Sequence, residues 1–170
     1  MRVNKKKFIY LISPNKIYKK FFKDLQKVLE TGKINFFQLR LKKYSFKHKI
    51  LIGKKIKNIC KENNVKFLIN DDPILAKRLC ADGCHLGQKD VNIKEARKII
   101  GKKIIGVTCH NSITLAKIAI KAKASYIEGL KEKHHRTEGL YAHRLRFQSD
   151  RGAGISVVGW AERLGYIVRQ

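Results

Sequence analysis

Long hydrophobic runs are missing from this chain of 170 residues. The first apolar segment, residues 8–12, is shorter than the apolar core of a secretory signal peptide. No other run reaches the roughly 20 apolar residues that a membrane-spanning helix needs. The four cysteines, Cys60, Cys80, Cys84 and Cys109, also lack the spacing of a disulfide framework. We therefore expect a cytoplasmic protein with reduced thiols and no membrane partner.

Acidic residues are scarce as well. Lys and Arg together number 39 against 13 Asp and Glu, so the formal net charge is +26. Such a charge favours a polyanionic partner, and a basic nucleic-acid-binding protein is one alternative. However, the basic residues are spread along the chain, and no helix-turn-helix, RNA-recognition or zinc-finger pattern occurs. Nucleic acid is therefore the less favoured partner, and substrates that carry phosphates would explain part of the charge.

Short apolar runs alternate with helix-length segments through most of the chain. The strand-like runs are residues 8–12, 34–39, 66–69, 83–86, 103–107 and 125–127. Helices are predicted over residues 17–30, after a cap at Ser45, over residues 73–80, after a cap at Asn92, and from a cap at Asn111 to about Lys123. Strands buried on both faces and separated by helices indicate a parallel α/β sheet. A glycine-rich turn after the first strand is absent, which argues against a dinucleotide-binding fold. We predict a TIM (β/α)8 barrel, whose catalytic face would collect the polar residues that follow the strands.

Residues 67–90 place acidic groups after two consecutive strands. Because parallel strands joined by a helix carry their carboxyl ends to the same end of a sheet, we expect Asp71 and Asp90 to lie together. Carboxylates gathered in a lysine-rich protein suggest a metal site, and Mg²⁺ takes such oxygens together with waters and substrate phosphates. The competing interpretation is a turn residue for Asp71 and a loop residue for Asp90. Asp72 precedes Pro73, and we interpret it as a helix cap.

Other polar groups follow the second and fifth strands. Gln38, Arg40 and Lys42 fall on one side if the second strand extends that far. Arg can hold phosphate oxygens in a fork and Lys adds a point charge, whereas a solvated strand end is the competing interpretation. Thr108 offers a hydroxyl to a phosphate or ring. His110 is a further candidate for that role, or for packing at the barrel mouth.

A zinc site is disfavoured. The cysteine and histidine residues of this region fit no standard ligand spacing. In addition, Cys84 and His85 are neighbours on a strand, so their side chains point to opposite faces of the sheet.

Four ordered segments carry a resemblance to thiamine-phosphate synthase. They are Q-L-R-L-K at 38–42, L-I-N-D-D at 68–72, A-D-G-C-H-L-G-Q-K-D at 81–90 and I-I-G-V-T-C-H at 104–110. The similarity runs from about residue 8 to residue 127. It implies a TIM-barrel transferase of thiamine biosynthesis that joins an aminopyrimidine methyl diphosphate to a thiazole phosphate and releases diphosphate. Positioning and charge stabilisation carry this reaction, so we assign no catalytic acid or base.

The resemblance also implies ligands for particular residues. Those at the pyrimidine diphosphate would be Gln38, Arg40, Lys42, Asn70 and Thr108. Those that bind a single Mg²⁺ would be Asp71 and Asp90. Thr108 stands where the family usually has serine and keeps the hydroxyl.

The resemblance stops near Ile127. The family continues with a Thr-x-Thr-Lys loop and a Gly-Gly-Ile strand end that bind the thiazole phosphate, and neither follows here. Residues 1–127 hold 27 Lys and 4 Arg, whereas residues 128–170 hold 2 Lys and 6 Arg. We therefore predict the N-terminal part of a barrel over residues 1–127 and an atypical tail over residues 128–170. We hypothesise that the tail is frameshifted or foreign, which translation of the DNA in its other frames would test.

The tail is too short for the rest of an eightfold barrel at about thirty residues per βα unit. We expect an incomplete barrel with an exposed sheet edge, no thiazole-phosphate site and poor turnover. A second alternative is a non-catalytic binding or regulatory relative of the same barrel. The sequence predicts no oligomeric state.

Overall fold

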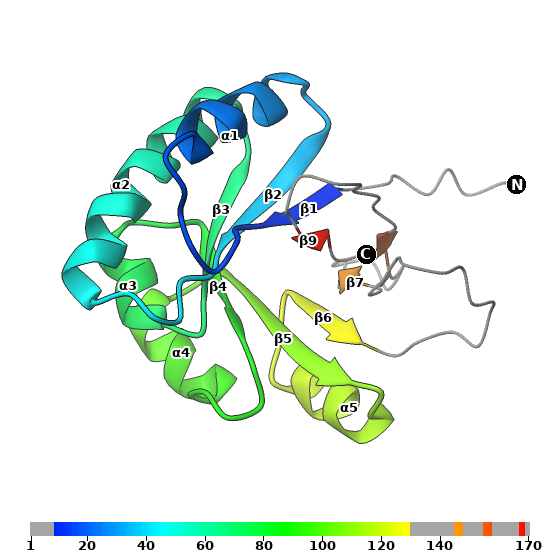
Figure 1. Cartoon of the computed structure of the whole chain (residues 1–170). Helices are drawn as coiled ribbons and strands as arrows, with labels where there is room; N and C mark the ends of the chain where they lie inside the picture. Colours follow the sequence, from blue (N-terminus) through cyan, green and yellow to red (C-terminus); the bar gives the residue numbers. More distant parts are fainter. Residues whose placement is uncertain (1–8, 130–144, 148–154, 158–166, 169–170) are drawn as a thin grey trace, which may run out of the picture.

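The computed structural model describes residues 9–129, 145–147, 155–157 and 167–168. Six parallel strands curl into a half-barrel, and five helices alternate with them along its outer face (Figure 1). The strands are β1 (Ile9–Ile12), β2 (Ile34–Leu39), β3 (Lys66–Asn70), β4 (Gly83–Leu86), β5 (Ile104–His110) and β6 (Tyr126–Gly129). The helices are α1 (Phe21–Glu30), α2 (Phe46–Glu62), α3 (Pro73–Arg78), α4 (Ile93–Ile100) and α5 (Ile113–Lys121). This is the predicted TIM-like α/β architecture in incomplete form.

Capping residues set the starts of most helices. Ser45, Asp72 and Asn92 each accept a backbone N–H of the first turn, as the sequence predicts. The predicted cap of α5 is wrong by one residue, because Ser112 and not Asn111 accepts the N–H of the first turn.

The predicted start of α1 is also wrong. The helix begins at Phe21, because the segment before it forms a turn in which the Phe21 N–H donates to the Tyr18 carbonyl at 3.0 Å. Ile17 keeps the helical spacing and still packs on the core from outside the helix.

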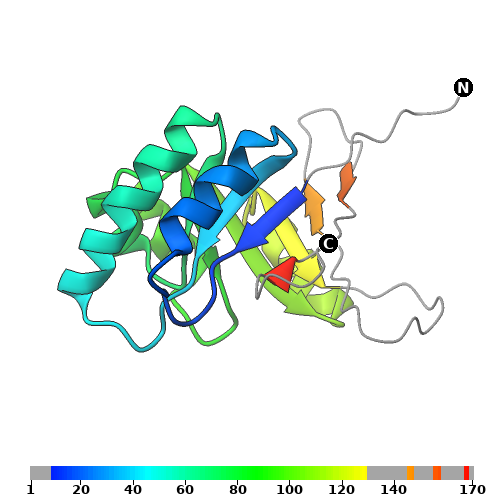
Figure 2. The same cartoon turned by 45° about the horizontal axis from the view of Figure 1, so that its top comes forward.

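Side chains of the strands alternate between two cores. Leu11, Phe37 and Ile69 face the outer core, together with helix residues such as Phe21 and Ile56. The helices lie along this outer face of the sheet (Figure 2). Tyr10 and Tyr126 face a smaller inner core inside the curve of the sheet, with Ile12 and Leu68. The alternation therefore sends every second strand residue into the interior of the half-barrel, where the site is built.

Gly106 on β5 makes room for this inner core. A Cβ atom at this position would lie 1.9 Å from the Cζ atom of Tyr126, which is closer than any side chain can approach. The aromatic ring of β6 therefore lies directly over the backbone of β5, and this contact puts the Tyr126 hydroxyl within reach of β1 and β4.

Three short strands extend the sheet at its two edges. They are β7 (Leu145–Phe147), β8 (Ile155–Val157) and β9 (Ile167–Val168). β7 pairs antiparallel with β6, β8 with β7, and β9 with β1. The sheet stays open, as expected for an incomplete barrel, but its outermost strands are β8 and β9, because the added strands pair with the backbone groups of β1 and β6. The rest of the predicted tail lies outside the described residues.

Candidate substrate and metal site

The carboxyl ends of β2 and β3 border a cavity of about 480 Å³, whose other lining residues come from α2, α3 and α4 and from the segments that follow β2, β3 and β4. Lys42, Lys49, Asn70, Asp71 and Asp72 contribute its polar lining. Asp71 has a φ of 64°, a left-handed conformation that aspartate tolerates better than most residues. Its N–H donates to the His85 carbonyl at 2.7 Å, so this turn is anchored to β4. Asp72 caps α3, as predicted, through a 2.8 Å bond from the Leu75 N–H.

The structure brings Asp71 and Asp90 together, as the strand order predicts. Burial and the neighbouring Asp90 carboxyl raise the pKa of Asp71, whereas Lys42 and His85 act in the opposite direction. Asp90 is held by the backbone N–H of Gly87, which donates to its Oδ2 atom at 2.6 Å. Because two adjacent carboxylates disfavour each other's charged form, a cation bound between them would stabilise both charges.

The donor set fits a small hard cation. Both groups are carboxylates, and a Mg²⁺ site usually draws its remaining ligands from water and substrate phosphate. Within the described part of the chain, no group of three or more His, Cys, Asp or Glu side chains could hold a metal. The two aspartates would therefore share a metal ion with oxygen atoms of water and of the bound ligand.

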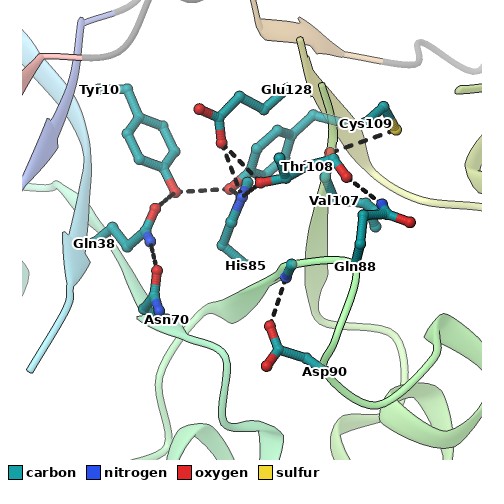
Figure 3. Close-up of polar contacts among 12 residues, drawn as sticks. Tyr10, Gln38, Asn70, His85, Gln88, Asp90, Val107, Thr108, Cys109 and Glu128 are labelled. Atoms are coloured by element: carbon teal, nitrogen blue, oxygen red, sulfur yellow. Dashed lines mark hydrogen bonds and ion pairs between the residues drawn. The ribbon is translucent and has the colours of Figure 1, made fainter. Parts of the chain in front are cut away.

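Asn70, which lines the cavity, forms an amide pair with the buried Gln38. The Gln38 Nε2 atom donates to the Asn70 Oδ1 atom (Figure 3). The Oε1 atom of Gln38 accepts the hydroxyl of Tyr10 at 2.7 Å. Gln38 is only 2% exposed, so this side chain is held from both ends.

Two predicted residues lie apart from this group. β2 ends at Leu39, so the alternation that would align Arg40 with Gln38 does not continue. The Arg40 Nη1 atom instead donates to the Asn15 Oδ1 atom at 2.7 Å. His110 is exposed at the end of β5, and no described hydrogen bond or cavity-lining contact joins it to Asp71.

Thr108 joins an interior cluster that sequence reasoning missed. Its hydroxyl donates to the Glu128 Oε2 atom at 3.0 Å and lies 2.7 Å from the His85 Nε2 atom. The Nε2 atom of His85 lies 3.0 Å from the Oε2 atom of Glu128, and both side chains are buried. The available signal was spacing, because Tyr126 and Glu128 are two residues apart on one strand and so share its inner face.

Tyr126 links this cluster to the amide pair. Its hydroxyl lies 2.7 Å from the Tyr10 hydroxyl and 2.9 Å from the His85 Nδ1 atom. Burial, followed by the effect of Tyr10, raises the pKa of Tyr126 well above its usual value. The phenol therefore keeps its proton and takes part as a neutral hydrogen-bonding group.

The family model described as "Thiamine monophosphate synthase" matches residues 9–128, which span β1 to β6. The chain belongs to the thiamine monophosphate synthase family. The resemblance carried by the four sequence segments is thereby confirmed. Membership in the thiamine monophosphate synthase family also weighs against the nucleic-acid-binding alternative.

Two relatives are named thiamine-phosphate synthase. The chain is 64% identical over 130 residues to that of Pelagibacter ubique, covering 75% of this chain and 63% of the relative. It is 42% identical over 122 residues to that of Erythrobacter litoralis, covering 70% of this chain and 57% of the relative. The chain therefore spans about three fifths of the length of these members of the thiamine monophosphate synthase family.

A solved structure confirms the fold. The thiamine phosphate pyrophosphorylase from Pyrococcus furiosus superposes with a TM-score of 0.65 at 29% identity, covering 74% of this chain and 60% of that chain. The half-barrel thus has the architecture of this thiamine monophosphate synthase relative. In the described residues, no helix is long and apolar enough to cross a membrane.

Proposed function

We propose that the carboxyl ends of β2 to β5 form the donor half-site of a thiamine-phosphate synthase. This half-site would bind 4-amino-2-methyl-5-pyrimidinylmethyl diphosphate together with one Mg²⁺ in the cytoplasm. The observation that carries the proposal is the contact between the Asp71 and Asp90 carboxyl groups, with Asp71 lining, together with Lys42 and Asn70, a cavity wide enough for a small ligand. Family membership supports the choice of ligand.

Asp71 and Asp90 would hold Mg²⁺, which when bound would neutralise charge on the diphosphate as it leaves. Lys42 would add a positive charge on the same side of the cavity. Arg40 would contact the diphosphate after its guanidinium turns away from Asn15. These residues would stabilise the negative charge that grows on the leaving oxygen as the C–O bond breaks.

Gln38 and Asn70 would hold the pyrimidine diphosphate on the inner side of the cavity. Because both amides are fixed by hydrogen bonds, they would orient the ligand with little further loss of side-chain freedom. Thr108 would lie at the same ligand. The reaction needs no strong general base, so positioning and charge would supply most of the rate.

The complete reaction would transfer the pyrimidine to a thiazole phosphate and give thiamine phosphate and diphosphate. The predicted place of the thiazole-phosphate site falls on the tail, outside the described residues. We therefore propose donor binding with poor turnover for this chain. An activity comparable to that of a full-length relative would contradict the second part of this proposal.

Calorimetric titration with the pyrimidine diphosphate, with and without Mg²⁺, tests donor binding. We expect saturable binding that requires Mg²⁺ and weakens at least about 100-fold in Asp71→Asn, since even residues that only support a metal ligand contribute 10–100-fold. Glu62→Gln, a charge change at the exposed end of α2, is the matched control and should bind like the wild type. Binding that ignores Mg²⁺ and Asp71→Asn but weakens steeply with salt would favour a non-specific polyanion surface.

A further inference from the structure

A lysine lies on the core-facing side of α2. The buried residues of this helix are Gly53, Ile56 and Cys60. Lys49 precedes Gly53 by about one helical turn and therefore shares their side of the helix. Its side chain is half-buried and lines the cavity that Asp71 also lines. A charged side chain thus occupies a position where the helical pattern calls for an apolar one.

The fold supplies no counter-charge for this lysine. Within the described part of the chain, no carboxylate forms an ion pair with Lys49 and no hydrogen bond is made by its side chain. Ser45 caps α2, so Lys49 belongs to the first turn, where the partial positive charge of the helix end disfavours a cation. The stability of the helix therefore does not account for the charge, whereas an anionic ligand in the cavity would.

The polar residues of the cavity run from the inside of the half-barrel toward its helices. Asn70 ends β3 and is bonded to the buried Gln38. Lys42 and Asp71 lie in the segments that follow β2 and β3. Lys49 comes from α2, which lies along the outer face of the sheet (Figure 1). A ligand that is held at Asn70 and extends along the cavity would therefore meet Lys49 with its outer end.

Charge favours a diphosphate at this outer end. The two carboxylates of Asp71 and Asp90 would offset the charge of one Mg²⁺, so basic side chains must balance the remaining charge of the ligand. Arg40 and Lys42 are the basic residues already assigned to the donor, and Arg40 is bonded to Asn15. A diphosphate carries more negative charge than a monophosphate and extends further. Lys49 supplies the additional cation on the wall of the same cavity.

We propose that Lys49 is a specificity-determining residue of the donor site, whose ammonium group binds the terminal phosphate of the pyrimidine diphosphate and so favours the diphosphate over the monophosphate. This role rests on the proposed donor half-site, to which it adds a residue of α2. The ammonium group donates hydrogen bonds to the terminal phosphate oxygens. Because this phosphate leaves with the diphosphate, Lys49 also stabilises the negative charge of the leaving group as the C–O bond breaks.

Lys49→Met tests the proposal, since it keeps the apolar stem of the side chain and removes the charge. The measurement is calorimetric titration, with Mg²⁺ present, with the pyrimidine diphosphate and with the corresponding pyrimidine monophosphate. We expect binding of the diphosphate to weaken about tenfold, because a charge-assisted hydrogen bond is lost. Binding of the monophosphate should be unchanged, because this ligand ends before it reaches Lys49.

Two further variants separate a contact from a general effect of charge. Lys47 lies in the same turn of α2 but is exposed and does not line the cavity. Lys47→Met removes the same charge from the same helix end, so it should leave the binding of both ligands unchanged. Lys49→Arg keeps a cation at the cavity and should retain the preference for the diphosphate.

The outcomes distinguish this role from the proposed function. Failure of the wild type to bind the pyrimidine diphosphate would overturn both. Diphosphate binding that Lys49→Met leaves unchanged, or a loss that is equal for the two ligands, would overturn only the role of Lys49. An equal loss in Lys47→Met would do the same, because it would indicate a diffuse effect of positive charge. A preference that is lost in Lys49→Met and kept in Lys49→Arg would support the contact with the terminal phosphate.

Discussion

Polar groups at the mouth of the half-barrel, where Asp71 and Asp90 lie, differ from those in its interior in how many partners the protein itself supplies. At the mouth, the carboxyl groups of Asp71 and Asp90 are in contact, and burial together with the Asp90 carboxyl raises the pKa of Asp71. In the interior, the Nε2 atom of His85 lies 3.0 Å from the Glu128 carboxylate, and hydrogen bonds link the two side chains to Tyr126 and Thr108. Interior groups are thus satisfied by the protein, whereas the mouth retains charge for a ligand.

Overfilling the interior should produce the largest loss of stability. In Gly106→Ala, a methyl group would lie 1.9 Å from the Tyr126 ring, which two hydrogen bonds hold in place. We expect the free energy of unfolding to fall by about 3 kcal/mol, the upper end for an overpacked core. Urea denaturation followed by circular dichroism measures this change.

Gly32→Ala is the matched control for Gly106→Ala. Gly32 has a φ of 67° and nothing within 4 Å of an added Cβ atom, so only backbone strain of about 1 kcal/mol is expected. Equal losses in the two variants would show that the Tyr126 ring can move, and that the interior is less tightly constrained than its contacts imply.

Removing one interior hydroxyl should have the next largest effect. Tyr126→Phe keeps the ring but leaves the buried Tyr10 hydroxyl and the His85 Nδ1 atom without this partner. We expect a loss of about 2 kcal/mol in the free energy of unfolding, since unsatisfied buried polar groups are costly.

The exposed Tyr18 provides the comparison for Tyr126→Phe. Its hydroxyl donates to Asp24 at the surface, where water can replace the bond. Tyr18→Phe should therefore change the free energy of unfolding by less than about 0.5 kcal/mol. A loss in Tyr126→Phe as small as this would mean that the interior bonds contribute no more than surface ones.

The thiols extend the comparison to the outer core. Burial raises the pKa of Cys60 and Cys84 to about 12 and that of Cys109 to about 11, whereas Cys80 is exposed. A raised pKa favours the protonated fold, so this stability is fully present below the ordinary thiol pKa of 9.0 and is lost as pH rises toward 11–12. We therefore expect unfolding by urea to become easier with pH in that range.

Thiol labelling at pH 8 gives a second measurement on the same residues. One of the four cysteines should react quickly in the folded protein, and all four should react in denaturant. Rapid reaction of Cys84 in the folded protein would mean that the outer core opens readily behind β4.

The mouth could be predicted from the sequence because its residues end strands within recognisable segments. Asp71 and Asp90 follow consecutive parallel strands, and strand order alone brings them together. The position of the Arg40 side chain was harder to predict. Its alignment with Gln38 required β2 to extend past Leu39, whereas the strand ends there. Where a strand stops depends on its pairing partners, and a single strand's alternation does not contain that information.

The interior could not be predicted to the same extent. Strands buried on both faces carry apolar residues at most positions, so their inner and outer sides look alike in the sequence. Tyr126 and Glu128 also lie at the end of the family resemblance, where motif spacing no longer guides assignment. Their contacts arise from the curvature of the sheet, which brings β6 opposite β1 and β4.

The smallest effect on stability is expected at the mouth, where function should suffer most. Asp71→Asn keeps a residue that tolerates the φ of 64° and removes a charge that the fold disfavours. Without Mg²⁺ at pH 7, the free energy of unfolding should change by less than about 0.5 kcal/mol or rise slightly. Because the raised pKa favours protonated Asp71 in the fold, wild-type stability should fall as pH rises above 3.8, and Asp71→Asn should lose this component. Urea denaturation of both proteins at several pH values above 3.8 measures the effect on stability. Titration of Asp71→Asn with the pyrimidine diphosphate and Mg²⁺ measures the effect on binding. A loss of stability as large as that of Tyr126→Phe would remove the distinction between mouth and interior, because Asp71 would then be a structural residue.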